Sequence, residues 1–457
     1  MKKINYLMIA LALSTLPLSS CSKDDEDPDN TVNNNQNPNN GNQNGDQNIN
    51  QNPNNNTTDE GKTYVCSVEN APAKMSEKLG LGWNLGNQLD AHANEVANET
   101  CWGNEATTQE AFNKIAAAGI KTVRIPVTWM GHIGGAPEYK IEEAWLNRVY
   151  EIVGYAENAG LNAIINIHHD GAESKYWLNI IKAAKITEAN TSIKAKFEAI
   201  WKQIAEKFKD KGDFLIFEAV NEIQDVKWGW GANRTDGGKQ YQVLNEWLNL
   251  FVKTVRATGG NNATRWLGIP AYNTDIDLAV ESLKIPYDEA GKLMVAVHFY
   301  APSEYTLSVK YSEWGHTGTD KAANSDEEMV KTQFKKLYDN YTQKNIPVYL
   351  GEFGNVCRNT DPNSKLEQFR RYYLEYVCKA AKNNSVAPIL WDNGVILRDN
   401  GVIGSGEKNE KHGYFNHATG EFINDGEVMI NAMLKAVNDK SEDYTLDWIY
   451  ENVAPKK

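Results

Sequence analysis

Short apolar runs rich in β-branched residues alternate with longer stretches of helical periodicity through most of the chain. Eight of these runs have the length and composition of buried strands, and they cover residues 81–85, 121–127, 162–168, 214–220, 265–269, 293–299, 347–351 and 387–391. Helical patterns separate them, for example at residues 107–119, 144–157, 193–208, 241–258, 327–344 and 365–381. Because helices follow strands in this order, we expect parallel pairing, and eight such units predict an α/β fold, the closed (β/α)8 barrel.

The helix predicted at residues 107–119 has both of its ends marked. Thr107 and Glu110 have the spacing of a capping box at its start, and Gly119 suits the left-handed position that ends a helix. The strand at residues 121–127 follows at once. This unit of helix and strand recurs along the chain and supports the barrel.

An open, doubly wound sheet is the rival architecture. It requires a glycine-rich phosphate loop after the first strand. The segment at residues 82–87, Gly-Trp-Asn-Leu-Gly-Asn, lacks that spacing and carries the bulky Trp83. We therefore favour the barrel, and a chain longer than the typical ~250 residues of that fold predicts insertions in several loops.

The first 20 residues are predicted to be an export signal. Lys2 and Lys3 precede an apolar run at residues 6–18, which is too short to span a bilayer as a helix. The sequence Leu-Ser-Ser-Cys at residues 18–21 resembles a bacterial lipobox, which implies lipid attachment to Cys21. The acidic residues 24–27 resemble a signal for the outer cell surface, so we expect a lipid anchor in the outer membrane, facing the exterior. The alternative is an ordinary secretory peptide.

The segment that follows, residues 21–62, is expected to be a disordered linker behind the lipidated Cys21. Fifteen of the 27 residues from 30 to 56 are asparagine, and so polar a segment buries too little apolar surface to offset its chain entropy. Residues 63–457 have ordinary charge content and many aromatic residues, and we expect them to form one globular domain and a monomer.

The net charge limits the kinds of binding partner, and the cysteine content limits the disulfides that can form. The formal net charge of −13 disfavours nucleic acid, because a phosphate backbone requires a basic face. Cys66, Cys101, Cys357 and Cys378 remain after lipidation of Cys21, and four cysteines in an exported protein could form two disulfides. Cys378 lies in an amphipathic pattern at residues 369–381, so a buried free thiol is an equal alternative there.

Polar or amphipathic side chains stand at the carboxyl ends of seven of the eight predicted strands. In this fold the chemistry collects at that rim. Two glutamates among them indicate glycoside hydrolysis, because one carboxyl must protonate the leaving oxygen while the other attacks or activates water. One glutamate alone is more often an ion-pair partner. The rim residues are Asn84, Asn87, Arg124, His168, His169, Asn221, Glu222, His298, Tyr300, Glu352 and Trp391.

Metal-dependent and serine hydrolysis are the chemical alternatives. His168, His169 and Asp170 look like a ligand cluster, but consecutive residues on a strand point to opposite faces, so the two histidines should not share one ion. Near the other strand ends the sequence has no further pair of histidines at ligand spacing, and it has no Gly-x-Ser-x-Gly elbow. We therefore expect no metal and no cofactor.

Seven sequence phrases stand at or near the predicted strand ends: Gly-Trp-Asn-Leu-Gly-Asn (82–87), Val-Arg-Ile-Pro-Val-Thr-Trp (123–129), Asn-Ile-His-His-Asp (166–170), Glu-Ala-Val-Asn-Glu (218–222), Val-His-Phe-Tyr (297–300), Leu-Gly-Glu-Phe-Gly (350–354) and Leu-Trp-Asp-Asn-Gly (390–394). Together they resemble glycoside hydrolase family 5, and they look most similar to its subfamily 4 of endoglucanases and xyloglucanases. The resemblance covers nearly all of the globular part and implies retaining hydrolysis of a β-1,4-glucan. Gln88 departs from it, since many relatives carry threonine there.

The resemblance also implies roles for the rim residues. It makes Glu222 the acid/base and Glu352 the nucleophile, with Arg124 and Tyr300 holding the nucleophile. It implies that His168, His298 and Asn221 bind the sugar at the cleavage point and that Trp391 is its stacking floor. The other strand-end residues expected to bind substrate are Asn84, Arg124, His169 and Tyr300. A general acid must stay protonated, so we expect burial and the nearby charge of Glu352 to raise the pKa of Glu222.

Loop tryptophans after the predicted strands are candidates for stacking on sugar rings. The possible cleft aromatics are Trp129, Trp177, Trp228 and Trp230, with Trp102 and Trp314 as further candidates; for any single one, core packing is an equal alternative. The remaining histidines, His92, His132, His316, His412 and His417, are expected to be solvated or structural. A β-mannanase or xylanase of the same mechanism and a non-catalytic glycan-binding lipoprotein remain as other functions.

Overall fold

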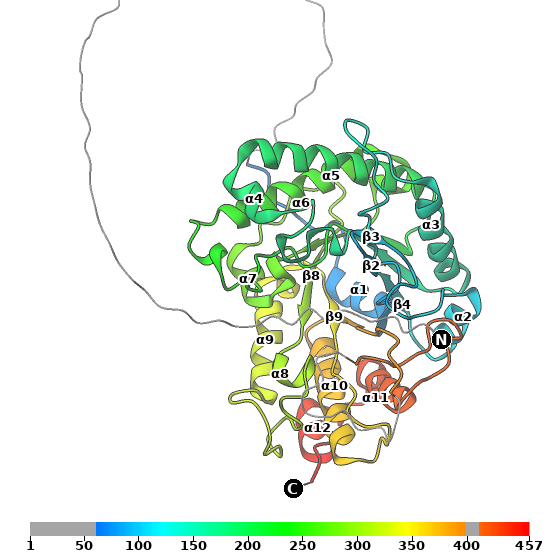
Figure 1. Cartoon of the computed structure of the whole chain (residues 1–457). Coiled ribbons are helices and arrows are strands. Elements are labelled where there is room, and N and C mark those ends of the chain that lie inside the picture. The colour runs from blue at the N-terminus through cyan, green and yellow to red at the C-terminus, as the bar shows by residue number, and fades with distance from the viewer. Residues whose placement is uncertain (1–60, 398–410, 457) are drawn as a thin grey trace, which may run out of the picture. The chain divides into compact units, whose positions relative to one another are not determined.

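The computed structural model describes residues 61–397 and 411–456. The predicted signal segment, Cys21 and the asparagine-rich linker as far as residue 60 lie outside the described residues. Within these residues the predicted barrel is confirmed: eight parallel strands close in the order β1-β10-β9-β8-β7-β6-β5-β4, surrounded by helices (Figure 1). The strands are β1 (Gly82–Asn84), β4 (Thr122–Ile125), β5 (Asn162–Ile165), β6 (Leu215–Glu218), β7 (Leu267–Pro270), β8 (Leu293–Phe299), β9 (Val348–Phe353) and β10 (Val386–Leu390).

Most predicted helices are present, and the structure adds shorter ones. The helices are α1 (Ala71–Leu79), α2 (Gln109–Ala117), α3 (Glu143–Asn158), α4 (Ile180–Lys185), α5 (Thr187–Lys207), α6 (Lys239–Ala257), α7 (Ile276–Ser282), α8 (Ser303–Thr306), α9 (Glu327–Asn340), α10 (Lys365–Asn383), α11 (Gly426–Asn438) and α12 (Leu446–Asn452). A hairpin of β2 (His92–Ala93) and β3 (Val96–Ala97) lies after β1.

Helix α1, which the sequence analysis did not predict, lies at the amino-terminal end of the barrel. Its buried residues pack against side chains from the strands, among them Ile164 and Met294. The Thr122 hydroxyl at the start of β4 donates a hydrogen bond to the carbonyl of Leu79 at the end of α1. Because this end is closed by apolar packing, the opposite rim is left for chemistry.

The capping residue of α2 differs from the prediction by one position. Thr108, not Thr107, is the N-cap, and its hydroxyl accepts the backbone N–H of Ala111. The Thr107 hydroxyl instead donates to the carbonyl of His417. Gly119 has a φ of +101°, so the left-handed helix end was predicted correctly.

The four cysteines of the barrel domain are free thiols. Cys357 and Cys378 are buried, and burial raises the pKa of both. The two disulfides left open by the sequence are therefore absent among these cysteines, and Cys378 is the buried thiol that its helix position suggested. Among the described helices, none has the length and apolarity needed to cross a bilayer.

Candidate active site

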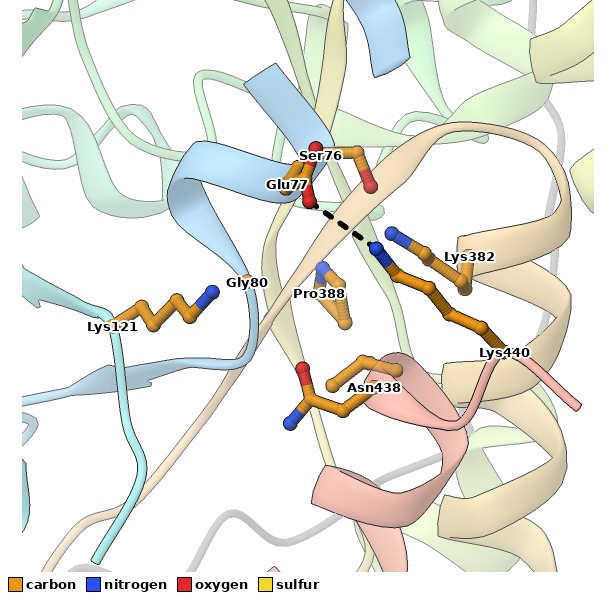
Figure 2. Close-up of a pocket in the computed structure, with 9 residues that line it drawn as sticks. Ser76, Glu77, Gly80, Lys121, Lys382, Pro388, Asn438 and Lys440 are labelled. Atoms are coloured by element: carbon orange, nitrogen blue, oxygen red, sulfur yellow. Dashed lines mark hydrogen bonds and ion pairs between the residues drawn. The ribbon is translucent and has the colours of Figure 1, made fainter. Parts of the chain in front are cut away.

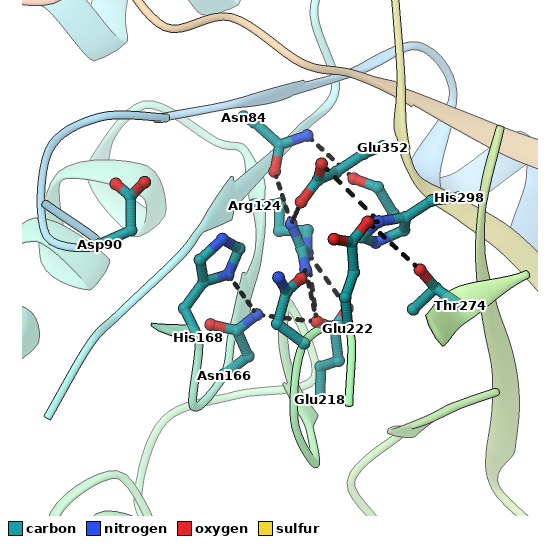
Figure 3. Close-up of polar contacts among 12 residues, drawn as sticks. Asn84, Asp90, Arg124, Asn166, His168, Glu218, Glu222, Thr274, His298 and Glu352 are labelled. Carbon is teal, nitrogen blue, oxygen red and sulfur yellow. Dashed lines mark hydrogen bonds and ion pairs between the residues drawn. The ribbon is translucent and has the colours of Figure 1, made fainter. Parts of the chain in front are cut away.

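The two candidate catalytic glutamates reach one point at the carboxyl-terminal rim from β6 and β9, which are separated by β7 and β8 in the barrel. Glu352 lies within β9, and Glu222 lies four residues beyond the end of β6. His298, on β8, stands between them with its Nδ1 2.7 Å from Glu222 Oε1 and 3.7 Å from Glu352 Oε2 (Figure 3). Oxygen atoms of the two carboxylates lie within 4.8 Å of each other. Such closeness suits a retaining hydrolase, in which the carboxyls are about 5–5.5 Å apart, and leaves no room for the extra water of an inverting enzyme.

Arg124 and Tyr300 hold Glu352 as the sequence analysis expected. Arg124 Nη1 lies 2.8 Å from Glu352 Oε1, and the Tyr300 hydroxyl donates to Oε2 over 3.0 Å. Arg124 is fully buried and does not line the cleft, so its prediction as a substrate-binding residue was wrong and its role is to hold the nucleophile candidate. Its Nη2 also donates to Asn221 Oδ1 over 2.8 Å. This bond turns the Asn221 amide nitrogen away from Arg124 and leaves it available as a donor.

Glu218, the last residue of β6, completes this network and was not singled out by the sequence analysis. It is 1% exposed, and its carboxylate accepts hydrogen bonds from Arg124 Nη2 at 2.7 Å, Asn166 Nδ2 at 2.8 Å and the Tyr349 hydroxyl at 2.7 Å. Burial raises the pKa of Glu218, but the charge and hydrogen bonds of Arg124 lower it by a larger amount, so the net shift is downward. Arg124 thus stands between two carboxylates, Glu218 below and Glu352 at the rim.

Replacing Glu218 with glutamine is expected to destabilise the protein by about 3 kcal/mol, because it breaks a buried ion pair and leaves the Arg124 charge partly uncompensated. We also expect kcat to fall more than ten-fold, since Arg124 then loses the contact that fixes its position against Glu352. Urea unfolding and steady-state kinetics measure the two effects. Tyr349→Phe is the matched control, because it removes one hydrogen bond to the same carboxylate and keeps the charge. Equal effects of both variants would contradict the prediction.

Asn84 was expected to bind substrate, and the structure contradicts this. Asn84 is fully buried, and its amide donates to the carbonyls of Gly351 and Leu390 at 2.9 and 3.1 Å. Its Oδ1 accepts from Arg124 Nη1 at 3.0 Å. The physical reason is that β1 is short and Asn84, its last residue, still points its side chain into the barrel, where it contacts Arg124. Asn84 therefore positions Arg124.

A cleft of about 710 Å³ opens over the glutamates. Most of the residues predicted to bind substrate line it together: His168, His169, Asn221, His298, Tyr300 and Trp391. The rings of Trp391 and His168 are parallel to within 1° at a centroid distance of 6.2 Å. Further lining residues come from loops and helices that the sequence did not assign to the site, among them Asn273, Asp275, Ile276, Ser303 and Gln333.

His168 is a neutral hydrogen-bond donor toward the cleft. Burial lowers its pKa well below the ordinary value, and electrostatic interactions with His169, Arg124 and His298 lower it further. Asn166 Oδ1 accepts the backbone N–H of Val127, so its Nδ2 faces His168 Nδ1, 3.1 Å away. Nδ1 is then the acceptor and Nε2 carries the hydrogen.

The pKa of Glu222 is lowered, contrary to the prediction. Burial raises it, but the hydrogen bond and charge of His298 act in the opposite direction, and the charges of Arg124 and His169 add to that effect. The prediction rested on burial and on the charge of Glu352, whereas His298 Nδ1 lies 2.7 Å from this carboxyl, a contact that the sequence does not show. In the free protein Glu222 is therefore stabilised in its ionised form.

The predicted cleft tryptophans divide between the cleft and the core. Trp228 and Trp230 line the cleft and are 56% and 59% exposed. Trp129 and Trp314 are fully buried, so both predictions were wrong. Trp177 packs partly against the core, and its indole nitrogen donates to Asp170. The difference is local: Gly229 separates Trp228 from Trp230, whereas Trp129 continues from the buried strand β4 and donates to the carbonyl of Asn166.

His168 and His169 do not point to opposite faces, so that prediction was wrong. Strand β5 ends at Ile165, and a 3₁₀ turn begins at His169. The two rings consequently lie edge to face with centroids 4.5 Å apart. The alternation rule of strands does not apply to these residues.

Three clusters among the described residues bring possible metal ligands within 4.8 Å of one another: Asp90, His168 and His169; Glu222, His298 and Glu352; Cys357, Glu367 and Asp425. In each cluster a carboxylate already has a partner elsewhere in the protein. Asp90 accepts backbone N–H groups of Asn87 and Gln88, Arg124 pairs with Glu352, and Arg370 pairs with Asp425. Each of these three carboxylates therefore has a partner from the protein, with Asp425 Oδ2 as the one oxygen among them that is buried without a hydrogen bond, and we assign no metal to the clusters.

The five other histidines have structural surroundings, as expected for most of them. His132 bonds to Glu142 and His316 to Glu327, His92 packs against the Trp102 ring, and His417 is buried beside Trp83. His412 is completely buried, and burial together with the charges of Arg370 and Arg358 lowers its pKa to about 3.

A smaller hollow of about 120 Å³ lies among residues at the other end of the barrel (Figure 2). Lysine side chains and Glu77 line it, and the Lys440 ammonium pairs with Glu77 at 3.5 Å. It contains neither a carboxylate pair nor an exposed aromatic ring, so the cleft over Glu222 and Glu352 is the candidate active site.

Comparisons with known proteins agree with this geometry. The family model "Cellulase (glycosyl hydrolase family 5)" matches residues 89–395. Endoglucanase A of Paenibacillus barcinonensis is 37% identical over 341 residues, which cover 70% of this chain and 82% of that protein. A GH5-4 broad specificity endoglucanase from Bacteroides salanitronis is 52% identical, with a TM-score of 0.76 over 83% of this chain and 98% of that chain. A family 5 xyloglucanase from Paenibacillus pabuli is 36% identical, with a TM-score of 0.71 over 80% and 100% of the two chains.

Proposed function

The chain belongs to glycosyl hydrolase family 5, and from this premise we propose that it is a retaining endo-β-1,4-glucanase of subfamily 4, with Glu222 as acid/base and Glu352 as nucleophile. The observation that carries the proposal is the carboxylate pair, whose oxygens lie within 4.8 Å at the floor of a cleft. Two carboxyls at this distance can attack and protonate the same glycosidic bond from its two sides.

The two steps follow from the contacts of each carboxyl. Glu352 attacks the anomeric carbon while Glu222 gives its proton to the glycosidic oxygen, so the bond to the leaving sugar breaks and a glycosyl ester forms on Glu352. Glu222 then takes a proton from a water molecule, which attacks the same carbon and releases Glu352. Arg124 and Tyr300 each hold one oxygen of Glu352, which fixes the attacking carboxylate in place.

Glu222 must gain a proton before the first step, although its pKa is lowered in the free protein. A sugar chain in the cleft excludes water from the carboxyl, and desolvation disfavours its charged form. Substrate entry therefore raises the pKa of Glu222 towards the value that a general acid requires. Protonation of Glu222 is therefore coupled to substrate binding.

Three side chains at the cleft offer the contacts that a glucose ring needs. The Asn221 amide nitrogen and the His168 Nε2–H group are donors whose other atoms are held by Arg124 and Asn166. Trp391 presents an indole ring beside them. An aromatic face with oriented polar groups is the usual way to bind a sugar's apolar face and hydroxyls together.

We propose internal β-1,4-glucosidic bonds of cellulose, xyloglucan and mixed-linkage glucan as the substrates. In support, one similar structure is of ZgEngAGH5_4 with a cellotriose, one of a Bacteroides ovatus GH5 xyloglucanase with a XXXG heptasaccharide, and one of a GH5 lichenase from Caldicellulosiruptor with cellotetraose. Reducing-sugar release from tamarind xyloglucan, carboxymethylcellulose, mixed-linkage glucan, mannan and xylan tests the choice. Absence of release from all three glucans would overturn it, and proton NMR of the first products must show the β-anomer.

We further propose that the chain is a surface lipoprotein attached through Cys21. The support is the order of basic start, apolar run and Leu-Ser-Ser-Cys in the sequence. In cells of a Gram-negative host, Cys21→Ala is expected to move glucanase activity from the outer-membrane fraction to the soluble fraction. Cys66→Ala is the control, and activity that stays with the membrane in the Cys21 variant would contradict the anchor.

A further inference from the structure

A second hollow, of about 630 Å³, lies on the outer side of the barrel between α6 and the segment that follows α7. We call it the side groove and define it by Tyr241, Gln242, Asn245, Asn249, Glu281 and Tyr287. Lys284 and Lys62 balance the carboxylates of Glu281 and Glu246 along it. A groove without a dominant charge is suited to a neutral ligand.

The α6 wall of the side groove carries a stripe of polar side chains. Gln242, Asn245, Glu246 and Asn249 have the spacing i, i+3, i+4 and i+7, which places them on one helix face. Asn245 is held by Ser282 and Lys284 of the opposite wall. Among the described residues no hydrogen bond is recorded for the side-chain amides of Gln242 and Asn249. These two amides are available to bind hydroxyl groups.

Helix α7 connects the side groove to the active-site cleft. Ile276, the first residue of α7, lines the cleft, whereas Glu281 and Ser282 at its other end line the side groove. Seven residues of α-helix span only about 10 Å at a rise of 1.5 Å per residue. The two hollows are therefore separated by one short helix.

Arg234 contacts residues of both the cleft and the side groove on the surface. Its guanidinium lies 5.3 Å from the centroid of the Trp230 ring, which lines the cleft. The same group donates to the Tyr241 hydroxyl at 3.0 Å and pairs with Glu281 at 2.7 Å, and both of these line the side groove. A continuous path of exposed rings and polar groups thus leads from Trp228 and Trp230 into the side groove.

We propose that the side groove binds the part of a neutral β-1,4-linked polysaccharide that extends beyond the cleft, on the side of the leaving group. This inference rests on the proposed function, in which Glu222 protonates the leaving group. Glu222 and the two exposed tryptophans lie on the same segment after β6, and this segment leads to the side groove on the leaving-group side. Tyrosine rings, free amides and carboxylates are the groups that recognise a chain of hydroxylated rings. The side groove therefore raises affinity for long chains and has no effect on short ones.

The test compares long and short substrates in the full-length protein. In the triple variant Gln242→Ala/Asn249→Ala/Tyr287→Ala, KM for soluble hydroxyethyl cellulose is expected to rise on the order of fivefold, the effect of losing a few modest contacts. The kinetics on an aryl β-cellobioside should remain those of the parent. Affinity electrophoresis in gels that contain hydroxyethyl cellulose provides a binding measurement without turnover, with each set of substitutions placed on the Glu352→Gln background.

Tyr338→Ala on α9 is the matched control, since Tyr338 is an exposed tyrosine outside both hollows. It should leave KM and gel mobility unchanged, and circular dichroism must show the same fold for all variants. A triple variant with the parent's KM and gel retardation on the polymer would overturn the side groove. Failure of the proposed function is distinct from this result, because the parent itself would then release no sugar from any glucan.

Discussion

The Glu222→Ala protein is expected to lose about 10³–10⁴-fold of its activity on polymeric glucan, while it still completes the first step on an activated aryl cellobioside. A general acid contributes roughly 10²–10⁴-fold, and the natural leaving group, a sugar hydroxyl, needs all of that help. A dinitrophenolate leaving group departs without a proton. Glu352 retains Arg124 and Tyr300 in this variant, so its attack is unimpaired.

Stopped-flow absorbance is the measurement for this prediction. The variant should release one equivalent of dinitrophenolate in a burst and then stall, since no base is left to activate water for the second step. Added azide should restore turnover and yield a β-glycosyl azide, because azide needs no base. Glu421→Ala is the control, because it removes an exposed carboxylate that does not line the cleft. Equal loss on both substrates would show that the acid is another residue.

The pH dependence of the parent protein tests the same assignment. The basic limb of kcat/KM reports the free enzyme and that of kcat reports the complex. The pKa of Glu222 is lowered in the free protein by His298, and substrate burial raises it. The proton of the acid is thus lost at lower pH in the free enzyme, so the basic limb of kcat should lie at higher pH than that of kcat/KM.

The positions of the rim residues were predictable because the strand pattern carries them. Buried strands must end at one rim of a closed parallel barrel, so Glu222, His298 and Glu352 could be brought together before any coordinates existed. Glu218 is harder to recognise from sequence, because it lies within the apolar run predicted as a strand at residues 214–220, two residues before the end of that run. A charged residue within such a run is itself a signal, since burying it requires a partner.

What the sequence could not settle depends on contacts between distant loops. Trp129 and Trp228 both follow strand ends, yet one is fully buried and the other is 56% exposed. Nothing in local spacing shows that the Trp129 indole finds the carbonyl of Asn166. The lowered pKa of Glu222 has the same origin, because the effect comes from His298 on a different strand. The side groove likewise needs α6 and α7 to be placed side by side.

Glu352→Gln is expected to have the largest effect of all, a loss of at least about 10⁴-fold on polymer and activated aryl cellobioside alike, because the amide cannot supply the electron pair that forms the glycosyl ester. Glutamine keeps the shape of the side chain and an oxygen that accepts from Arg124 Nη1 or the Tyr300 hydroxyl. The variant should therefore still fold and still bind cello-oligosaccharides, which calorimetry measures.

The position of the covalent bond separates a nucleophile from a residue that only supports one. An activated 2-deoxy-2-fluoro cellobioside should inactivate the parent by trapping the glycosyl ester, and peptide mass mapping should find the label on Glu352. The Glu222→Ala protein should be labelled at the same residue, since its attack step is intact. Arg124 touches both Glu218 and Glu352, but only Glu352 reaches the cleft. A label on Glu222, or on any residue other than Glu352, would reverse the roles of the two carboxylates.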